Sequence, residues 1–98
     1  MKRSRIRPQS PRRASERSER EKVVRAALDR DRGCIAKPLL PGVKCWGPLD
    51  GHEVKTRGRG GSHLDLDNVV TLCRRHHDWV GENPKRAHEL GLLKHGWE

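Results

Sequence analysis

The stretch Cys73-Arg-Arg-His-His-Asp-Trp79 decides the fold expected for this 98-residue chain, because Cys73 and His76 have the Cys-x-x-His spacing of half a zinc site. Cys34 and Cys45, with ten residues between them, can complete a Cys3His set. This interval is wider than the usual two to four residues, but the entropy of loop closure grows slowly with loop length. The alternative is that Cys34 and Cys45 are small buried hydrophobic residues and that the Cys-x-x-His pair is coincidental. The pattern favours a structural Zn²⁺ bound by Cys34, Cys45, Cys73 and His76.

The composition supports a metal-stabilised domain. Only 32% of the residues are hydrophobic, with three Trp and no Phe or Tyr, so the core must be small. Three cysteines cannot all pair, and neither a secretory leader nor a membrane-spanning run is present, so we expect a cytoplasmic protein with no membrane partner. The net charge of +9 predicts an anionic partner, of which nucleic acid is the commonest; the alternative is that the charge only keeps the protein soluble.

The chain divides into a basic arm and one domain. Residues 1–14 are rich in Arg and are expected to be disordered, and residues 15–98 form the domain, with its motifs in residues 34–82. An amphipathic helix is predicted over Ser15–Arg32, with Ser15 or Ser18 as N-cap. Further elements are expected at 51–56 and 69–72 (strands), 74–81 (helix) and from Pro84 to Gly91 (helix). The C-terminal Leu90, Leu92, Leu93 and Trp97 are expected to pack on the core.

His77 is not needed for the zinc site and calls for another partner. His52, Asn68 and His77 follow one another at intervals of sixteen and nine residues, and Cys-x-x-His overlaps the last of them. This pattern, from about Cys34 to Trp79, resembles the HNH endonucleases. The text "RGRGG…DLDNVVTLCRRHHDWV" is most similar to small HNH proteins of phages and prophages. The resemblance implies an α+β fold: a small ββα-metal finger stapled by structural zinc, with an N-terminal helix and a short C-terminal helix.

The resemblance also implies a role for each of these residues. His52, on the first strand, and His77, on the helix, are the expected ligands of one catalytic divalent metal (Mg²⁺, Mn²⁺, Ni²⁺ or Zn²⁺). Asn68 is expected to brace the loop between the strands and to orient the catalytic base. A third ligand found in some relatives is replaced here by Gly81, so waters and phosphate oxygens would complete the metal's shell.

Glu53 is the main departure from the family pattern, because its position normally holds the histidine that acts as general base. A glutamate is ionised at pH 7 and can accept a proton, although it is a weaker base than imidazole. Glu53 therefore acts as general base, or binds metal, or marks a domain that has kept binding and lost catalysis. His63 is an alternative base, and Asp50 is an alternative ligand in a shifted register; a loop histidine and a turn residue are the plainer interpretations.

The predicted function is metal-dependent hydrolysis of DNA phosphodiester bonds, by nicking or double-strand cleavage. Arg57 and Arg59 flank the glycine loop and can hold DNA phosphates through planar donor forks, although a solvated basic turn would look the same. The alternative function is a catalytically weak or inactive, zinc-stabilised module that binds nucleic acid. The resemblance further implies a phage- or prophage-encoded protein in a bacterial host. We expect it to act as a monomer, with phage packaging proteins as a further candidate partner.

Overall fold

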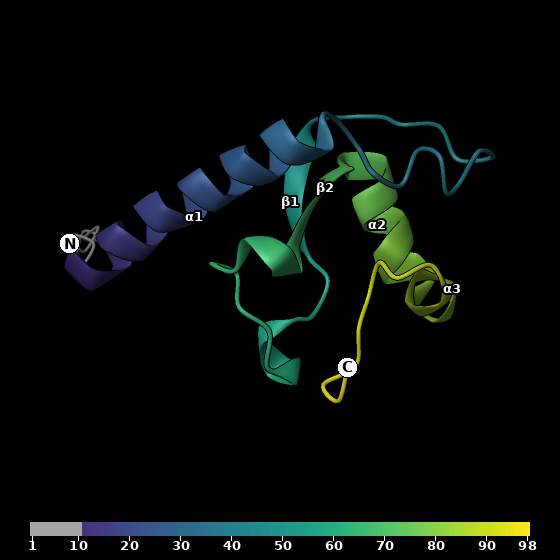
Figure 1. Cartoon of the computed structure of the whole chain (residues 1–98). Helices are drawn as coiled ribbons and strands as arrows, with labels where there is room; N and C mark the ends of the chain where they lie inside the picture. Colours follow the sequence, from purple (N-terminus) through teal and green to yellow (C-terminus); the bar gives the residue numbers. More distant parts are fainter. Residues whose placement is uncertain (1–10) are drawn as a thin grey trace, which may run out of the picture.

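The computed structural model describes residues 11–98 as a small α+β fold in which a two-stranded sheet has helices on both faces (Figure 1). This coarse prediction is confirmed. In chain order the elements are α1 (Pro11–Asp31), β1 (Leu49–Glu53), the 3-10 turns η1 (Arg57–Arg59) and η2 (Leu66–Asn68), β2 (Val69–Cys73), α2 (Arg74–Glu82) and α3 (Pro84–Glu89). None of the helices in residues 11–98 combines the length and apolar character that crossing a membrane requires.

The sheet pairs β1 with β2 in antiparallel register, from Leu49 opposite Cys73 to Glu53 opposite Val69. Side chains of a strand alternate between the two faces, so neighbours on β1 point in opposite directions. Gly51 lies against α1, because a Cβ added there would come within 2.9 Å of Val24 Cγ2. His52 lies on the other face, where its ring meets that of His77 on α2. The sheet therefore separates α1 from the helix that carries both candidate sites.

Helix α1 begins earlier than the sequence pattern predicted. Residues 1–10 lie outside the described residues, and residues 11–14 form the first turn of α1 instead of the end of an arm. Ser15 and Ser18 consequently lie inside the helix and are not its N-cap. A proline in the first turn explains the earlier start, since its missing N–H has no partner there and its φ angle is already helical.

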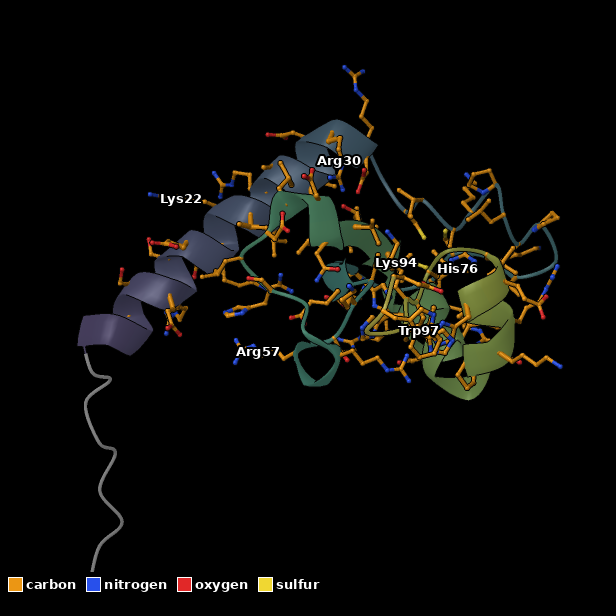
Figure 2. All side chains as sticks on the ribbon, turned by 60° about the horizontal axis from the view of Figure 1, so that its bottom comes forward. Lys22, Arg30, Arg57, His76, Lys94 and Trp97 are labelled. Carbon is orange, nitrogen blue, oxygen red and sulfur yellow. The ribbon has the colours of Figure 1, made fainter. Side chains whose placement is uncertain are left out.

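Two arginines and an aspartate fasten α1 to the sheet. Arg20 donates to the backbone oxygens of His63 and Gly51, at 2.8 and 3.3 Å. Arg30 donates to those of Leu66 and Val69, at 3.0 and 2.6 Å, and the carboxylate of Asp31 accepts from the backbone N–H of Thr71 at 2.9 Å. Lys22, by contrast, points away from the sheet (Figure 2). The helix thus uses part of its positive charge in internal contacts and leaves the rest on its outer face.

The core is small, as the composition indicated, and its buried side chains are aliphatic. It consists of Ala36, Leu40, Leu72, Val80, Ala87 and Leu92, and Trp79, Leu90 and Leu93 are among the partly buried side chains packed against it. Trp97 was predicted to join this core, and that is wrong: 81% of its surface is exposed. Strand β1 also starts two residues before the predicted range and ends three residues before its predicted end, while α2 and α3 lie close to their predicted ranges.

Candidate metal centres

Three sulfurs and one imidazole nitrogen converge where β2 meets α2. Cys34, Cys45, Cys73 and His76 place one ligand atom each within 4.8 Å of the others. His76 Nδ1 lies 3.3 Å from Cys34 Sγ, 3.5 Å from Cys45 Sγ and 3.0 Å from Cys73 Sγ. His76 is in the first turn of α2 and is completely buried (Figure 2). None of the three cysteines is in a disulfide. The predicted Cys3His cluster is therefore present.

Local backbone contacts bring the two distant cysteines to the Cys73–His76 pair. Cys73 ends β2 and caps α2, because its sulfur accepts from the backbone N–H of His76. After Cys34, the N–H of Ile35 donates to Thr71 in β2 at 3.0 Å. After Cys45, the oxygen of Trp46 accepts from Arg75 in α2, also at 3.0 Å. These two hydrogen bonds hold both ends of the segment between Cys34 and Cys45 against β2 and α2.

The donor set fits a tetrahedral zinc ion. With ordinary Zn–S and Zn–N bond lengths, a tetrahedral angle puts sulfur and nitrogen about 3.6 Å apart, close to the three separations at His76 Nδ1. The other ring nitrogen, Nε2, is buried and has no hydrogen-bond partner among the described residues. A zinc ligand of this type usually donates its second N–H to a carbonyl or carboxylate, so His76 departs from the common pattern on that side.

The thiols differ in how readily they ionise. Desolvation, with hydrogen bonds to Cys73 and Cys34, raises the pKa of Cys45 to about 11. Burial disfavours the thiolate of Cys73 as well, but contacts with the backbone N–H groups of His76 and Trp46 outweigh it and lower the pKa of that thiol to about 6. Cys73, at the N-terminus of α2, thus carries negative charge more readily than Cys45.

A second pair of ligand candidates, His52 and His77, meets on the far side of α2's first turn. Their ring centroids are 5.4 Å apart, with the rings at 78° to each other. His52 is buried, and its Nε2–H donates to the backbone oxygen of Leu92 at 2.6 Å. Burial lowers the pKa of His52, with the nearby His77 acting in the same direction and the Leu92 bond and Glu53 acting against them. A neutral imidazole that donates through Nε2 keeps the lone pair of Nδ1, the form in which histidine binds a metal.

Asn68 braces the loop between the strands, as expected. Its Oδ1 accepts from the N–H of Lys55 at 2.8 Å, and its Nδ2 donates to the oxygens of Lys55 and Ser62 at 2.8 and 3.0 Å. Gly61 permits this closure, because a Cβ there would lie 1.7 Å from the Lys55 oxygen. Of the loop glycines, only Gly60 has a positive φ, 90°. The loop is therefore held closed mainly by the side-chain amide of Asn68 and by the close approach of the Gly61 backbone to the Lys55 oxygen.

Glu53 and Asp50 occupy different faces of β1. Alternation places Glu53 on the face of Gly51, toward α1, whereas His52 points toward α2. Asp50 lies on the His52 face and pairs with Arg74 at the start of α2, at 3.2 Å. Gly81, one turn after His77, is exposed. In residues 11–98 the two histidines are thus the predicted catalytic ligands that come together, and strand alternation assigns Glu53 to the other face of β1.

The predicted DNA-binding arginines already have contacts inside the protein. The guanidinium of Arg57 contacts the ring of His63, with Nη2 2.6 Å from Nδ1. Arg59 reaches His88 Nε2 at 3.1 Å and the oxygen of Lys94 at 3.3 Å. Both residues remain exposed on the loop, and Arg57 projects from it in Figure 2. Their contacts fix their positions and leave part of each donor fork open.

The sequence interpretation missed the part played by the C-terminal segment. Leu92 orients His52, and the N–H of Lys94 donates to Val54 at 2.9 Å, just after β1. Beyond it, the rings of His88, His95 and Trp97 form a stack. The only sequence signal was the concentration of His and Trp in residues 88–97, which has no fixed spacing to a known motif.

Comparison of the chain with protein-family models, curated proteins and solved structures found no match. The functional interpretation therefore rests on the geometry of the two centres.

Proposed function

We propose that the chain is a metal-dependent, HNH-like endonuclease that hydrolyses phosphodiester bonds in DNA. The observation that carries the proposal is the state of His52: buried, neutral, and donating Nε2–H to Leu92 while its ring meets that of His77. This is the arrangement in which a backbone carbonyl orients a metal-binding histidine. The order of strand, braced loop, strand and helix around the pair supports the same proposal.

The His52–His77 pair fits a divalent ion in part. Two imidazoles come together, and no third His, Cys, Asp or Glu of residues 11–98 joins them, so oxygens of water and phosphate would supply the remaining positions. When bound, such an ion stabilises the negative charge that develops on the phosphate and on the leaving oxygen. The chain's own contribution is to orient His52 through the Leu92 oxygen, to place His77 beside it, and to keep the Asn68 loop closed.

Glu53 is the candidate general base of this proposal. Its carboxylate would take the proton of the water that attacks the phosphate. Removing the charge without changing the shape, by Glu53→Gln, is expected to lower cleavage about 10²- to 10⁴-fold and to leave DNA binding intact. A loss smaller than about threefold would assign proton transfer to another group or to solvent.

A second candidate function, a catalytically inactive nucleic-acid-binding module, is favoured by one observation. Strand alternation puts Glu53, the last residue of β1, on the opposite face from His52, so the strand itself does not aim base and metal ligand at one site. Such a module would keep the zinc centre and the basic surface and would use neither His77 nor Glu53. The predicted packaging partner has no corresponding observation and stays a prediction.

Nicking of supercoiled plasmid by zinc-loaded protein, with Mg²⁺, Mn²⁺, Ni²⁺ or added Zn²⁺, tests the proposal. We expect cleavage by the wild type and a loss of at least about 100-fold in His77→Ala, because one of two protein ligands is gone. Asp78→Ala is the matched control, since Asp78 is the exposed next residue on α2. Plasmid that stays intact with every metal, while DNA binding persists, would reject the nuclease and leave the binding module.

A further inference from the structure

Three aromatic rings of the C-terminal segment, those of His88, His95 and Trp97, form a stack that exposes the indole of Trp97 to solvent. The His88 and His95 rings are 4.0 Å apart at 12°, and the His95 and Trp97 rings are 4.1 Å apart at 5°. Trp97 forms the outer end of the stack, and 81% of its surface is exposed. One face of the indole is thus covered by His95, and the high exposure leaves the opposite face open to solvent.

The stack is fixed to the folded domain at several points. His88 lies in α3, and Arg59 from the glycine loop contacts both its ring and the backbone oxygen of Lys94. Lys55 Nζ donates to the backbone oxygens of Gly96 and Glu98, on either side of Trp97. An indole held in this way loses little further conformational entropy when a ligand stacks on it, which favours binding.

Cations lie along the stack. Arg59 and Lys94 are exposed, and the guanidinium of Arg59 contacts both the His88 ring and the backbone oxygen of Lys94. The neighbouring pocket, of about 300 Å³, is lined by Asp65, Asp67 and Glu98 as well as by lysines, so it is a poor place for a phosphate. Lys94 lies at this pocket and Arg59 outside its lining, so the ligand that matches the surface has a flat π-face for the indole and a negative charge for these two exposed cations.

We propose that Trp97 is a stacking platform for one unpaired nucleobase of DNA, with the adjacent phosphate held by Arg59 and Lys94. The choice of DNA rests on the proposed function; the choice of an unpaired base rests on the stack. Faces of bases inside a duplex are covered by their neighbours, so the indole can reach only a base in a single strand, at an end, or displaced from the helix. The platform lies beside the loop that Asn68 closes, which would direct the chain toward DNA with locally unpaired strands.

Equilibrium binding of a labelled single-stranded DNA oligonucleotide, its duplex and the single-stranded RNA of the same sequence tests this proposal. The protein is zinc-loaded, and no Mg²⁺, Mn²⁺ or Ni²⁺ is added, so that cleavage does not enter. In Trp97→Ala we expect affinity for single-stranded DNA to fall about 5- to 100-fold, the range for one stacked base, and affinity for the duplex to change less than about twofold. Trp97→Phe, which keeps an aromatic face, should recover most of the loss.

Trp46→Ala is the matched control, because Trp46 is 70% exposed and stacks on no ring among the described residues. It should bind the single strand like the wild type. Wild-type affinity in Trp97→Ala, an equal loss on duplex, or a loss confined to RNA would each overturn the proposal. Trp97-dependent binding together with an uncut plasmid would reject the nuclease alone, so the two proposals can fail separately.

Discussion

The two candidate centres begin at adjacent residues, His76 and His77, and differ in how complete they are in the free chain. Around His76, three sulfurs lie within 3.5 Å of the imidazole nitrogen. Around His77, one further imidazole is in place, and the predicted base Glu53 belongs by strand alternation to the other face of β1. The Cys3His cluster is the zinc half of the domain, and the His52–His77 pair with the Asn68 loop is the histidine half.

The difference follows from what each half is required to do. A structural zinc would supply stability that the small core does not, so its four ligands must be brought together by the fold itself. A hydrolytic metal must leave positions for water and phosphate, so few protein ligands suffice. The geometry of the zinc half can thus be complete in the chain alone, while under the proposed function that of the histidine half would be completed by the substrate.

Breaking the zinc half should have the largest effect. Cys73→Ser removes a ligand that also caps α2, and structural zinc contributes on the order of 10 kcal/mol to folding. We expect the variant to bind less than one zinc per chain and to lose cooperative unfolding, as measured by elemental analysis and circular dichroism.

His77→Ala is the matched variant for the histidine half. It should keep one tightly bound zinc and a wild-type spectrum. Stoichiometric zinc and cooperative unfolding in Cys73→Ser would show that the fold does not depend on the cluster.

The zinc half could be predicted because its signal is chemical. Cysteines are rare in this chain, and a Cys-x-x-His pair at the junction of a strand and a helix is typical of metal binding. The sequence did not show how Cys34 and Cys45 reach that pair, since backbone bonds from Ile35 and Trp46 to β2 and α2 carry no residue signature.

The remaining features depend on packing that a linear pattern does not express. Trp97 was assigned to the core because it is hydrophobic. In the structure Leu92 is the buried core residue of this segment, and the indole of Trp97 stacks on His95 instead. The intervals between His52, Asn68 and His77 predicted that these residues share one region, and the side of the strand to which Glu53 points could not be compared with His52 until β1 was placed.

A smaller effect, confined to the histidine half, is expected from Gly61→Ala. The added Cβ would lie 1.7 Å from the Lys55 oxygen, which is backbone and cannot rotate away. We expect a destabilisation of about 3 kcal/mol in urea unfolding, in the range for an overpacked site, with reduced nicking and unchanged zinc content.

Gly58→Ala is the control for Gly61→Ala, because its Cβ would meet nothing within 4 Å. It should stay within about 0.5 kcal/mol of the wild type. Equal stability of the two variants would mean that the closed loop is not a rigid part of the histidine half.

The smallest effect is expected at Asp31, which ties α1 to β2 and so supports both halves. The hydrogen bond from Arg30 lowers the pKa of Asp31 below 3.8; desolvation opposes this, and the N–H of Thr71 adds to it. Because the pKa is lower in the folded chain than in the unfolded one, the carboxylate stabilises the fold above pH 3.8 and this contribution is lost as the pH falls through the folded-state pKa. Asp31→Asn should therefore lose about 1–2 kcal/mol, equally at about pH 7 and pH 5, in urea unfolding with excess zinc. If wild type and Asp31→Asn already have the same free energy of unfolding at about pH 5, the Asp31 charge does not hold α1 on the sheet.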